Sequence, residues 1–194
     1  MKKILFVMAL FGLIQGCTTT SGGSDSSGSG PSTSRSFEMV AQDDRIATTA
    51  NNMLASNSEI TKKANISVES YNRVVLLTGQ APTAELRQQA VDLVKKVPDI
   101  TRIFNQITIG TPTSPLVRSK DAATTANVKA RMFATTNLKA NNFKIITEDG
   151  TVYILGTATR EQGDIAGKVA RDSTGVQRVV KLIEYVSEDK KATT

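Results

Sequence analysis

The second half of this chain repeats the pattern of the first. The stretch "VVLLTGQAPTAELRQQAVDLVKKVPDITRIFNQITI" (74–109) aligns with "TVYILGTATREQGDIAGKVARDSTGVQRVVKLIEYV" (151–186), with Gly79 over Gly156 and, after a one-residue gap, Ala90 over Ala166. The tetrapeptide "TTAN" also occurs in both halves, at 48–51 and again at 124–127. Because self-similarity in a fixed order of elements indicates repeated structural units, the sequence predicts two copies of one module.

Each copy has the pattern of a helix, two strands, a second helix and a closing strand. Each first helix is opened by an aspartate suited to N-capping. A hairpin follows, with its turn at Tyr71-Asn72 in the first copy and at Asp149-Gly150 in the second. The expected helices span 44–56, 83–97, 121–136 and 160–173, and the closing strands span 101–109 and 177–187.

The order α-β-β-α-β predicts an α+β fold, in which two helices cover one face of a three-stranded mixed sheet. The strand-helix-strand connection should be right-handed. The first module is expected at 43–110 and the second at 120–187, with a linker at 111–119 that holds Pro112 and Pro115. Because a linker this short permits little separation, we expect the two modules to pack against each other.

The first 36 residues have the composition of a targeting segment followed by an unfolded leash. Two lysines precede an apolar run of eleven residues, 4–14, and a run that short is typical of a signal peptide rather than of a membrane-spanning helix. From 18 to 36 the residues are mostly Ser, Gly and Thr, too poor in apolar groups to fold. We therefore expect a signal peptide at 1–16, a flexible linker at 17–36 that begins at the single cysteine, Cys17, and a short tail at 188–194.

The residue inventory excludes the commonest enzyme chemistries. The chain has no histidine, no tryptophan and one cysteine, so Ser-His-Asp and Cys-His catalysis and His/Cys zinc sites are excluded. Gly79 and Gly156 do not lie in a phosphate-binding loop, and we expect them to permit close packing at a strand end. We therefore predict a protein that is not an enzyme and has no catalytic residue, no cofactor and no metal site.

The excess of positive charge lies in the second copy. The whole chain has 24 basic and 18 acidic residues, a net charge of +6. Residues 37–110 hold eight basic and eight acidic side chains, whereas residues 120–186 hold ten basic and seven acidic ones, so the copies carry 0 and +3. Such a balance favours an anionic partner, although it does not choose among nucleic acid, lipid headgroups and cell-wall polymers, and excess charge also serves solubility.

The expected first helix of the second copy has two apolar faces. At 100° per residue, Thr124, Val128 and Met132 form one stripe, which is the expected core face. The residues on the opposite side are Ala122, Ala126, Ala130 and Phe133. Because interfacial helices meet lipid headgroups with aromatic residues and nearby cations, the candidate phospholipid-binding residues are Phe133, Lys129 and Lys139. Two alternatives remain: Phe133 is the core residue in place of Met132, or this face packs on the first module.

The order of elements, the glycine that ends the middle strand, and the segments "VPDITRIFNQITI" and "STGVQRVVKLIEYV" resemble the BON domain over about residues 43–186. The run "IQGC" that ends at Cys17 resembles a bacterial lipobox, in which the cysteine is acylated and the signal peptide is cut before it. With the leash and the paired modules, the chain is similar to the dual-BON outer-membrane lipoproteins of the DolP type. In the first copy Asp99 stands where the second has Gly175, which leaves the local turn there open.

The resemblance implies both a location and a function. It implies acyl chains, palmitate among them, on Cys17, and Thr18 after the cysteine favours the outer membrane, with the protein facing the periplasm. It also implies that the second domain binds anionic phospholipid and that the protein supports outer-membrane integrity, often at the division site; nucleic acid is not an expected partner. Members of the group can carry an aromatic residue at the start of the second domain's first helix, where this chain has Ala122-Ala123.

A second class of function fits the same sequence. In that alternative the paired domains are a scaffold that docks on other proteins, such as an outer-membrane assembly machine, and the basic charge is incidental. Binding to anionic vesicles distinguishes the two classes. The sequence leaves the oligomeric state open.

Overall fold

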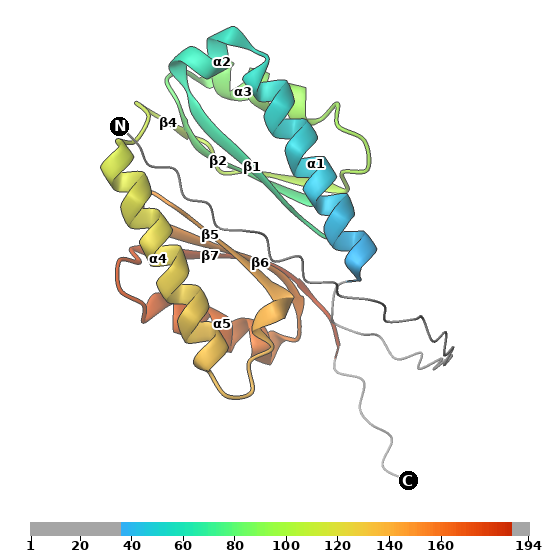
Figure 1. Cartoon of the computed structure of the whole chain (residues 1–194), viewed down its shortest axis with the longest axis vertical. Helices are drawn as coiled ribbons and strands as arrows, with labels where there is room; N and C mark the ends of the chain where they lie inside the picture. The colour runs from blue at the N-terminus through green and yellow to red at the C-terminus, as the bar shows by residue number, and fades with distance from the viewer. Residues whose placement is uncertain (1–35, 188–194) are drawn as a thin grey trace, which may run out of the picture. The chain divides into compact units, whose positions relative to one another are not determined.

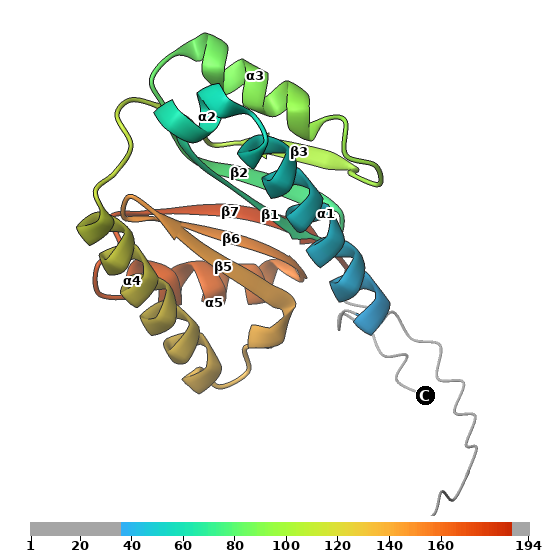
Figure 2. The same cartoon turned by 45° about the horizontal axis from the view of Figure 1, so that its top comes forward.

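The computed structural model describes residues 36–187, and Figures 1 and 2 show the order of the helices and strands along them. The first module contains α1 (Phe37–Ala55), α2 (Ser58–Lys63), β1 (Asn65–Tyr71), β2 (Val74–Ala81), α3 (Ala84–Val94), β3 (Arg102–Asn105) and β4 (Thr108–Ile109). The second contains α4 (Pro115–Ala134), the 3-10 helix η1 (Ala140–Asn142), β5 (Phe143–Glu148), β6 (Thr151–Ala158), α5 (Arg160–Arg171) and β7 (Arg178–Tyr185). The predicted signal peptide, Cys17 with its leash up to residue 35, and the tail at 188–194 lie outside the described residues.

Each module has a mixed sheet with its middle strand at the centre, as predicted. In the first module β1 pairs with β2 antiparallel and β2 pairs with β3 parallel. The second module repeats this arrangement with β5, β6 and β7. Two main helices cover one face of each sheet, α1 and α3 in the first module and α4 and α5 in the second (Figure 2). The prediction of two tandem α-β-β-α-β modules is therefore confirmed, with the short helices α2 and η1 added to it.

The closing strands differ between the modules. The turn that precedes the closing strand has a similar backbone conformation in both modules, because Asp99 and Gly175 both have a positive φ, 68° and 87°. In the first module, however, the expected strand at 101–109 is interrupted, and β3 and β4 pair with β2 separately. At the break, the side chain of Asn105 accepts a hydrogen bond from the backbone N–H of Ile107 at 3.1 Å, in competition with strand pairing.

The first helix of each module begins earlier than predicted. The N-caps are Ser36 and Ser114, whose hydroxyl groups accept hydrogen bonds from backbone N–H groups of the first turn. The expectation that Asp44 and Asp121 open these helices is wrong, because Asp44 is exposed within α1 and Asp121 is buried within α4. Since α4 begins at Pro115, only residues 110–114 separate it from β4.

The second hairpin turns through Asp149 and Gly150, as predicted. Their φ angles are 46° and 68°, the left-handed pair that a two-residue hairpin turn requires. The backbone N–H groups of both residues donate to the carboxylate of Asp121 on α4, at 2.8 and 2.9 Å. Asp121 is therefore buried because it holds this turn against the helix.

The first hairpin turns one residue later than predicted. Asn72 and Arg73 have positive φ, 49° and 64°, whereas Tyr71 is the last residue of β1. Asp43 of α1 is 1% exposed and accepts hydrogen bonds from the backbone N–H groups of Asn72 and Arg73 at 2.7 and 2.8 Å, and from the Ser70 hydroxyl at 2.7 Å. The carboxylate stabilises a turn that has no glycine.

Gly79 and Gly156 permit close packing near the strand ends, as predicted. At Gly79 φ is +110°, and a Cβ atom would lie 1.9 Å from the carbonyl oxygen of Asn65 on the paired strand. At Gly156 a Cβ atom would lie 2.6 Å from a ring carbon of Phe143 on β5. Neither position has room for a side chain.

Each module has its own hydrophobic core between its helices and its sheet. The first core includes Ile46, Ala50, Leu54, Val75, Leu77, Ala90 and Val94. The second includes Val128, Met132, Ile145, Val152, Ile154, Ala166 and Ala170. Of the helices formed by residues 36–187, none is both long and apolar enough to cross a membrane.

The sheet faces turned away from the helices join the two modules. Because side chains alternate along a strand, Leu76 of β2 and Leu155 of β6 point away from their own module's helices, and they share a buried cluster with Tyr71 and Tyr153. The Tyr71 hydroxyl donates to the carbonyl oxygen of Asn142 in the other module at 2.6 Å. The expected packing of the modules against each other thus has an apolar centre.

Charged and polar contacts surround this apolar centre. Lys144 Nζ lies 2.7 Å from Glu69 Oε2 of the first module. Gln80 Nε2 of the first module donates to Glu148 Oε1 at 2.6 Å. These pairs fix the register of one sheet on the other.

We expect the protein to become more stable on mild acidification because of Glu148. Burial raises the pKa of Glu148 above its usual value, against the smaller lowering effect of the hydrogen bond from Gln80. A carboxyl group with a raised pKa in the folded state binds its proton more readily there than in the unfolded chain. Its charge therefore destabilises the fold at neutral pH, and this penalty is relieved as the pH falls through the folded-state pKa.

We expect Glu148→Gln to be at least as stable as the wild type at about pH 7, with a smaller difference in stability at about pH 5. Urea unfolding at both pH values measures this difference. Equal pH dependence of stability in the two proteins would contradict the prediction.

Candidate functional site

Helix α4 carries two of the candidate lipid-binding residues, Lys129 and Phe133. Pro115 occupies the first turn, where its missing N–H leaves no hydrogen bond unmade. The buried residues of α4 recur every three or four positions, and they are Asp121, Thr124, Val128 and Met132. One face of α4 therefore packs on β5 and α5, and the opposite face is left outward.

Phe133 lies on the outward face of α4. Its side chain is 65% exposed, whereas Met132 is 1% exposed. The alternative in which Phe133 replaces Met132 in the core is therefore wrong, and an exposed Phe133 is not covered by the first module either. The outward face also exposes three small residues, Ala122, Ala126 and Ala130.

Lys129 is exposed and lies four residues before Phe133, a spacing that places the two side chains next to each other on a helix. Among residues 36–187 no acidic side chain pairs with Lys129. The nearby Arg131, by contrast, donates to the carbonyl oxygen of Asp172 at the end of α5. Lys129 is thus the cation of this half of α4 that remains available to an anionic partner.

Lys139 lies in the loop that follows α4, and this loop is held in place by α5. The backbone N–H of Lys139 donates to Gln162 Oε1 at 2.8 Å, and Gln162 Nε2 donates to the carbonyl oxygen of Asn137 at 2.6 Å. The Lys139 side chain is exposed. The two contacts of Gln162 therefore set where this third candidate residue is presented, a role that the sequence pattern did not reveal.

A further cation and aromatic residue lie at the same end of the module. The guanidinium carbon of Arg160, the first residue of α5, is 5.1 Å from the centre of the Tyr185 ring, within the range of a cation–π contact. Tyr185 is 39% exposed and ends β7. No sequence pattern indicates this pair, because the two residues are brought together only by the parallel pairing of β6 and β7. The exposed end of the second module thus combines aromatic side chains with cations.

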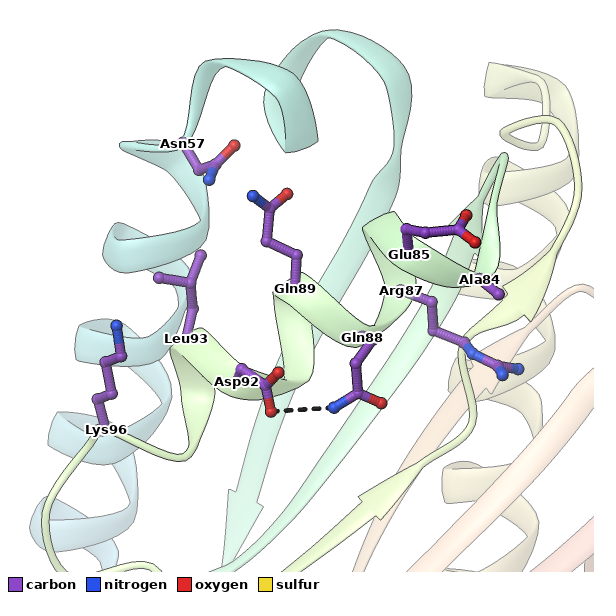
Figure 3. Close-up of a pocket in the computed structure, with 9 residues that line it drawn as sticks. All are labelled: Asn57, Ala84, Glu85, Arg87, Gln88, Gln89, Asp92, Leu93 and Lys96. Carbon is purple, nitrogen blue, oxygen red and sulfur yellow. Dashed lines mark hydrogen bonds between the residues drawn. The ribbon is translucent and has the colours of Figure 1, made fainter.

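A separate hollow of about 760 Å³ lies over α3 of the first module (Figure 3). Its lining residues are Asn57, Ala84, Glu85, Arg87, Gln88, Gln89, Asp92, Leu93 and Lys96. Gln88 donates to Asp92 at 2.9 Å, and hydrogen bonds from Lys95 and Gln88 lower the pKa of Asp92. None of the candidate lipid-binding residues lines this hollow, and within residues 36–187 no group of three or more acidic or other metal-ligating side chains is placed to hold a metal ion.

Sequences similar to this chain are found among known envelope and other bacterial proteins. The model of the BON domain matches residues 42–111 and 120–187. The outer membrane lipoprotein DolP of Haemophilus influenzae is 28% identical over 187 residues, 96% of this chain and 97% of that protein. A 21 kDa hemolysin of Actinobacillus pleuropneumoniae is 36% identical over 133 residues, 69% of each chain. Among solved structures, the C-terminal domain of CdsD from the type III secretion system of Chlamydia trachomatis aligns at 15% identity over 75% of this chain and 67% of that one, with a TM-score of 0.31, a likeness too weak to carry an argument.

Proposed function

Because this chain belongs to the BON-domain family, we propose that it is a lipid-anchored protein of the outer membrane, facing the periplasm, whose second module binds anionic phospholipid. Similarity to an outer membrane lipoprotein along nearly the whole of both chains supports the location. The function is binding rather than catalysis. Through this contact with lipid the protein contributes to the integrity of the outer membrane, at the division site among other places.

The observation that carries the proposal is the exposure of Phe133 on the outward face of α4, beside exposed Lys129 and the small residues Ala122, Ala126 and Ala130. Alanines allow the helix to approach the headgroups closely, and an aromatic side chain enters the region between headgroups and acyl chains. In this contact Lys129 and Lys139 bind lipid phosphates, and each interfacial cation contributes about 1 kcal/mol to binding near an anionic surface. The aromatic residue and the cations together select an anionic membrane.

Phe133→Ala is expected to weaken binding to phosphatidylglycerol vesicles about tenfold, since removing a half-buried aromatic side chain forfeits about 1–3 kcal/mol of apolar transfer. Flotation of a form that begins at Ser36 measures this. Leu116→Ala is the matched control, because Leu116 is also 65% exposed on α4 but lies about 25 Å away, at the start of the helix. Thermal unfolding of both variants should stay close to that of the wild type, because neither side chain belongs to a core.

The cations are tested in the same assay. Lys129→Ala with Lys139→Ala should weaken flotation several-fold, and added salt should do the same to the wild type. A folded Phe133→Ala protein that binds as well as the wild type would remove Phe133 from the site. Unchanged binding of the double variant would move the site off α4, and no flotation of the wild type at low salt would favour the protein-docking scaffold.

Cys17→Ala is expected to remove the protein from the outer-membrane fraction. Single acyl chains give only marginal anchoring, and several together hold a protein firmly, so losing the acylated residue leaves only the weaker, non-covalent contacts of the folded modules with the membrane. Fractionation of cells followed by a high-salt wash measures the loss. Retention of the variant with washed outer membranes would show that Cys17 is not the anchor.

A further inference from the structure

The first six residues of α1 extend beyond the core of the first module. None of residues 37–42 is buried, and the buried positions of α1 begin at Asp43. The helix end is formed nevertheless, because the Ser36 hydroxyl accepts a hydrogen bond from the N–H of Met39 at 3.2 Å. Phe37 is 88% exposed and Val40 is 36% exposed. We call residues 36–42 the α1 tip.

We propose that the α1 tip is a second membrane contact, in which Phe37 and Val40 enter the bilayer end-on. The two side chains are three residues apart and share a face of the helix. Glu38 is the single charged residue of the tip, so this contact is apolar and does not depend on attraction to anionic headgroups. Phe37 is also the most exposed large apolar side chain of residues 36–187, and its insertion into lipid would remove this apolar surface from water.

The length of chain before the tip favours lipid as the partner. Nineteen residues, 18–36, separate Cys17 from Phe37. Along the sequence, the tip is therefore the described segment nearest to the proposed anchor. The inference rests on the proposed function in this one respect, the acylation of Cys17.

The tip also lies beside the exposed end of the second module. Met39 lines a hollow of about 610 Å³ together with Ile183 and Glu184 of β7. Tyr185 follows directly and contacts Arg160 at the start of α5, whose first turn also holds the loop of Lys139. The tip thus lies beside the end of β7, which contacts the start of α5 and, through it, the cationic loop. This arrangement is compatible with one bilayer surface meeting both the tip and the loop.

The two membrane contacts differ in their response to salt. Binding through Lys129 and Lys139 weakens as salt screens the cations. The tip carries a net charge of −1 over residues 36–42, so screening leaves its insertion unchanged. This difference allows each contact to be measured while the other is present.

A nitroxide label at position 40 tests the tip in the full acylated chain, held in vesicles of phosphatidylglycerol and phosphatidylethanolamine. Since the chain has one cysteine and its thiol is acylated, Val40→Cys supplies a single thiol for labelling. We expect the label to collide several-fold less often with a water-soluble paramagnetic agent than a label at Thr48→Cys, an exposed position about 12 Å further along α1. Phe37→Ser should abolish this shielding, high salt should not, and Ile109→Ser, a control at a side chain that is 54% exposed, should leave it unchanged.

Equal collision rates at positions 40 and 48 would overturn the proposal. Shielding that appears only as the ratio of protein to lipid rises would overturn it in favour of a second copy of the chain, and labelling of Cys17 itself would overturn the anchoring on which it rests. A label at Ala130→Cys, on the outward face of α4, separates the tip from the proposed phospholipid site. Shielding at 40 without shielding at 130 supports the tip and removes the α4 site, whereas the reverse removes the tip and leaves the proposed function intact.

Discussion

Gly79→Ala is expected to unfold the first module. The added Cβ atom would lie 1.9 Å from the carbonyl oxygen of Asn65, and the backbone φ of +110° is one that L residues rarely adopt. Because the contact is with the backbone of a paired strand, relief requires β1 and β2 to separate at their end. Strain and overpacking each cost about 1–3 kcal/mol, so together they remove much of the stability of a small domain.

Urea unfolding followed by circular dichroism measures this loss. Gly110→Ala is the matched control, because nothing lies within 4 Å of the position that its Cβ would take. The control should change the free energy of unfolding by less than about 0.5 kcal/mol. Similar stability of the two variants would show that β1 and β2 accommodate a side chain at position 79.

Asp43→Ala is expected to destabilise the first module by about 3–5 kcal/mol, since each hydrogen bond to a buried charged group contributes about 1.5–3 kcal/mol and the donors left behind are desolvated. The carboxylate accepts three hydrogen bonds, two of them from the backbone of the turn at Asn72 and Arg73. Without it, two non-glycine residues must hold positive φ unaided. The free energy of unfolding, measured in urea, should fall accordingly.

Asp44→Ala provides the control for this second prediction. Asp44 is the next residue of α1 and is exposed, so its removal changes the same charge without touching the turn. We expect an effect within about 0.5 kcal/mol. Equal losses in the two variants would mean that charge on α1, rather than the hydrogen bonds of Asp43, is what stabilises the module.

The order of elements and the arrangement of the sheet were predictable because local sequence patterns indicate both. The hairpin at Asp149-Gly150 has the residues that a left-handed turn prefers, and the glycine at position 79 marks a close approach between strands. Because the two copies share one pattern, an assignment made in one copy also applied to the aligned residues of the other. Where local chemistry is weaker, as at Asn72-Arg73, the position of the turn was predicted one residue too early, because the carboxylate that stabilises it comes from another element.

The starts of α1 and α4 were missed for a related reason. Asp44 and Asp121 precede apolar residues at helical spacing, which is also how an N-cap looks in a sequence. The residues before them have no buried face, so no apolar period extends the helix toward Ser36 or Ser114. Only the folded chain shows Asp121 facing a hairpin turn.

The candidate site was partly predictable from the sequence. The period of α4 correctly assigned Met132 to the core and allowed Phe133 to be exposed, although neighbouring residues 100° apart leave such a choice open. The support of the Lys139 loop by Gln162 and the contact of Arg160 with Tyr185 join residues at least 23 positions apart. Contacts of that kind depend on how α5 and β7 pack, which no local pattern records.

The apolar cluster of Tyr71, Leu76, Tyr153 and Leu155 has a consequence for how the protein can be dissected. Each sheet is covered by helices on one side and by the other module's sheet on the second. A truncated form with a single module would present that second side to water, and the simplest cover for it is another copy of the same fragment. Vesicle binding by such a fragment would then depend on its self-association as well as on its affinity for lipid. The affinity for lipid can therefore be measured separately from self-association only on a protein that contains both modules.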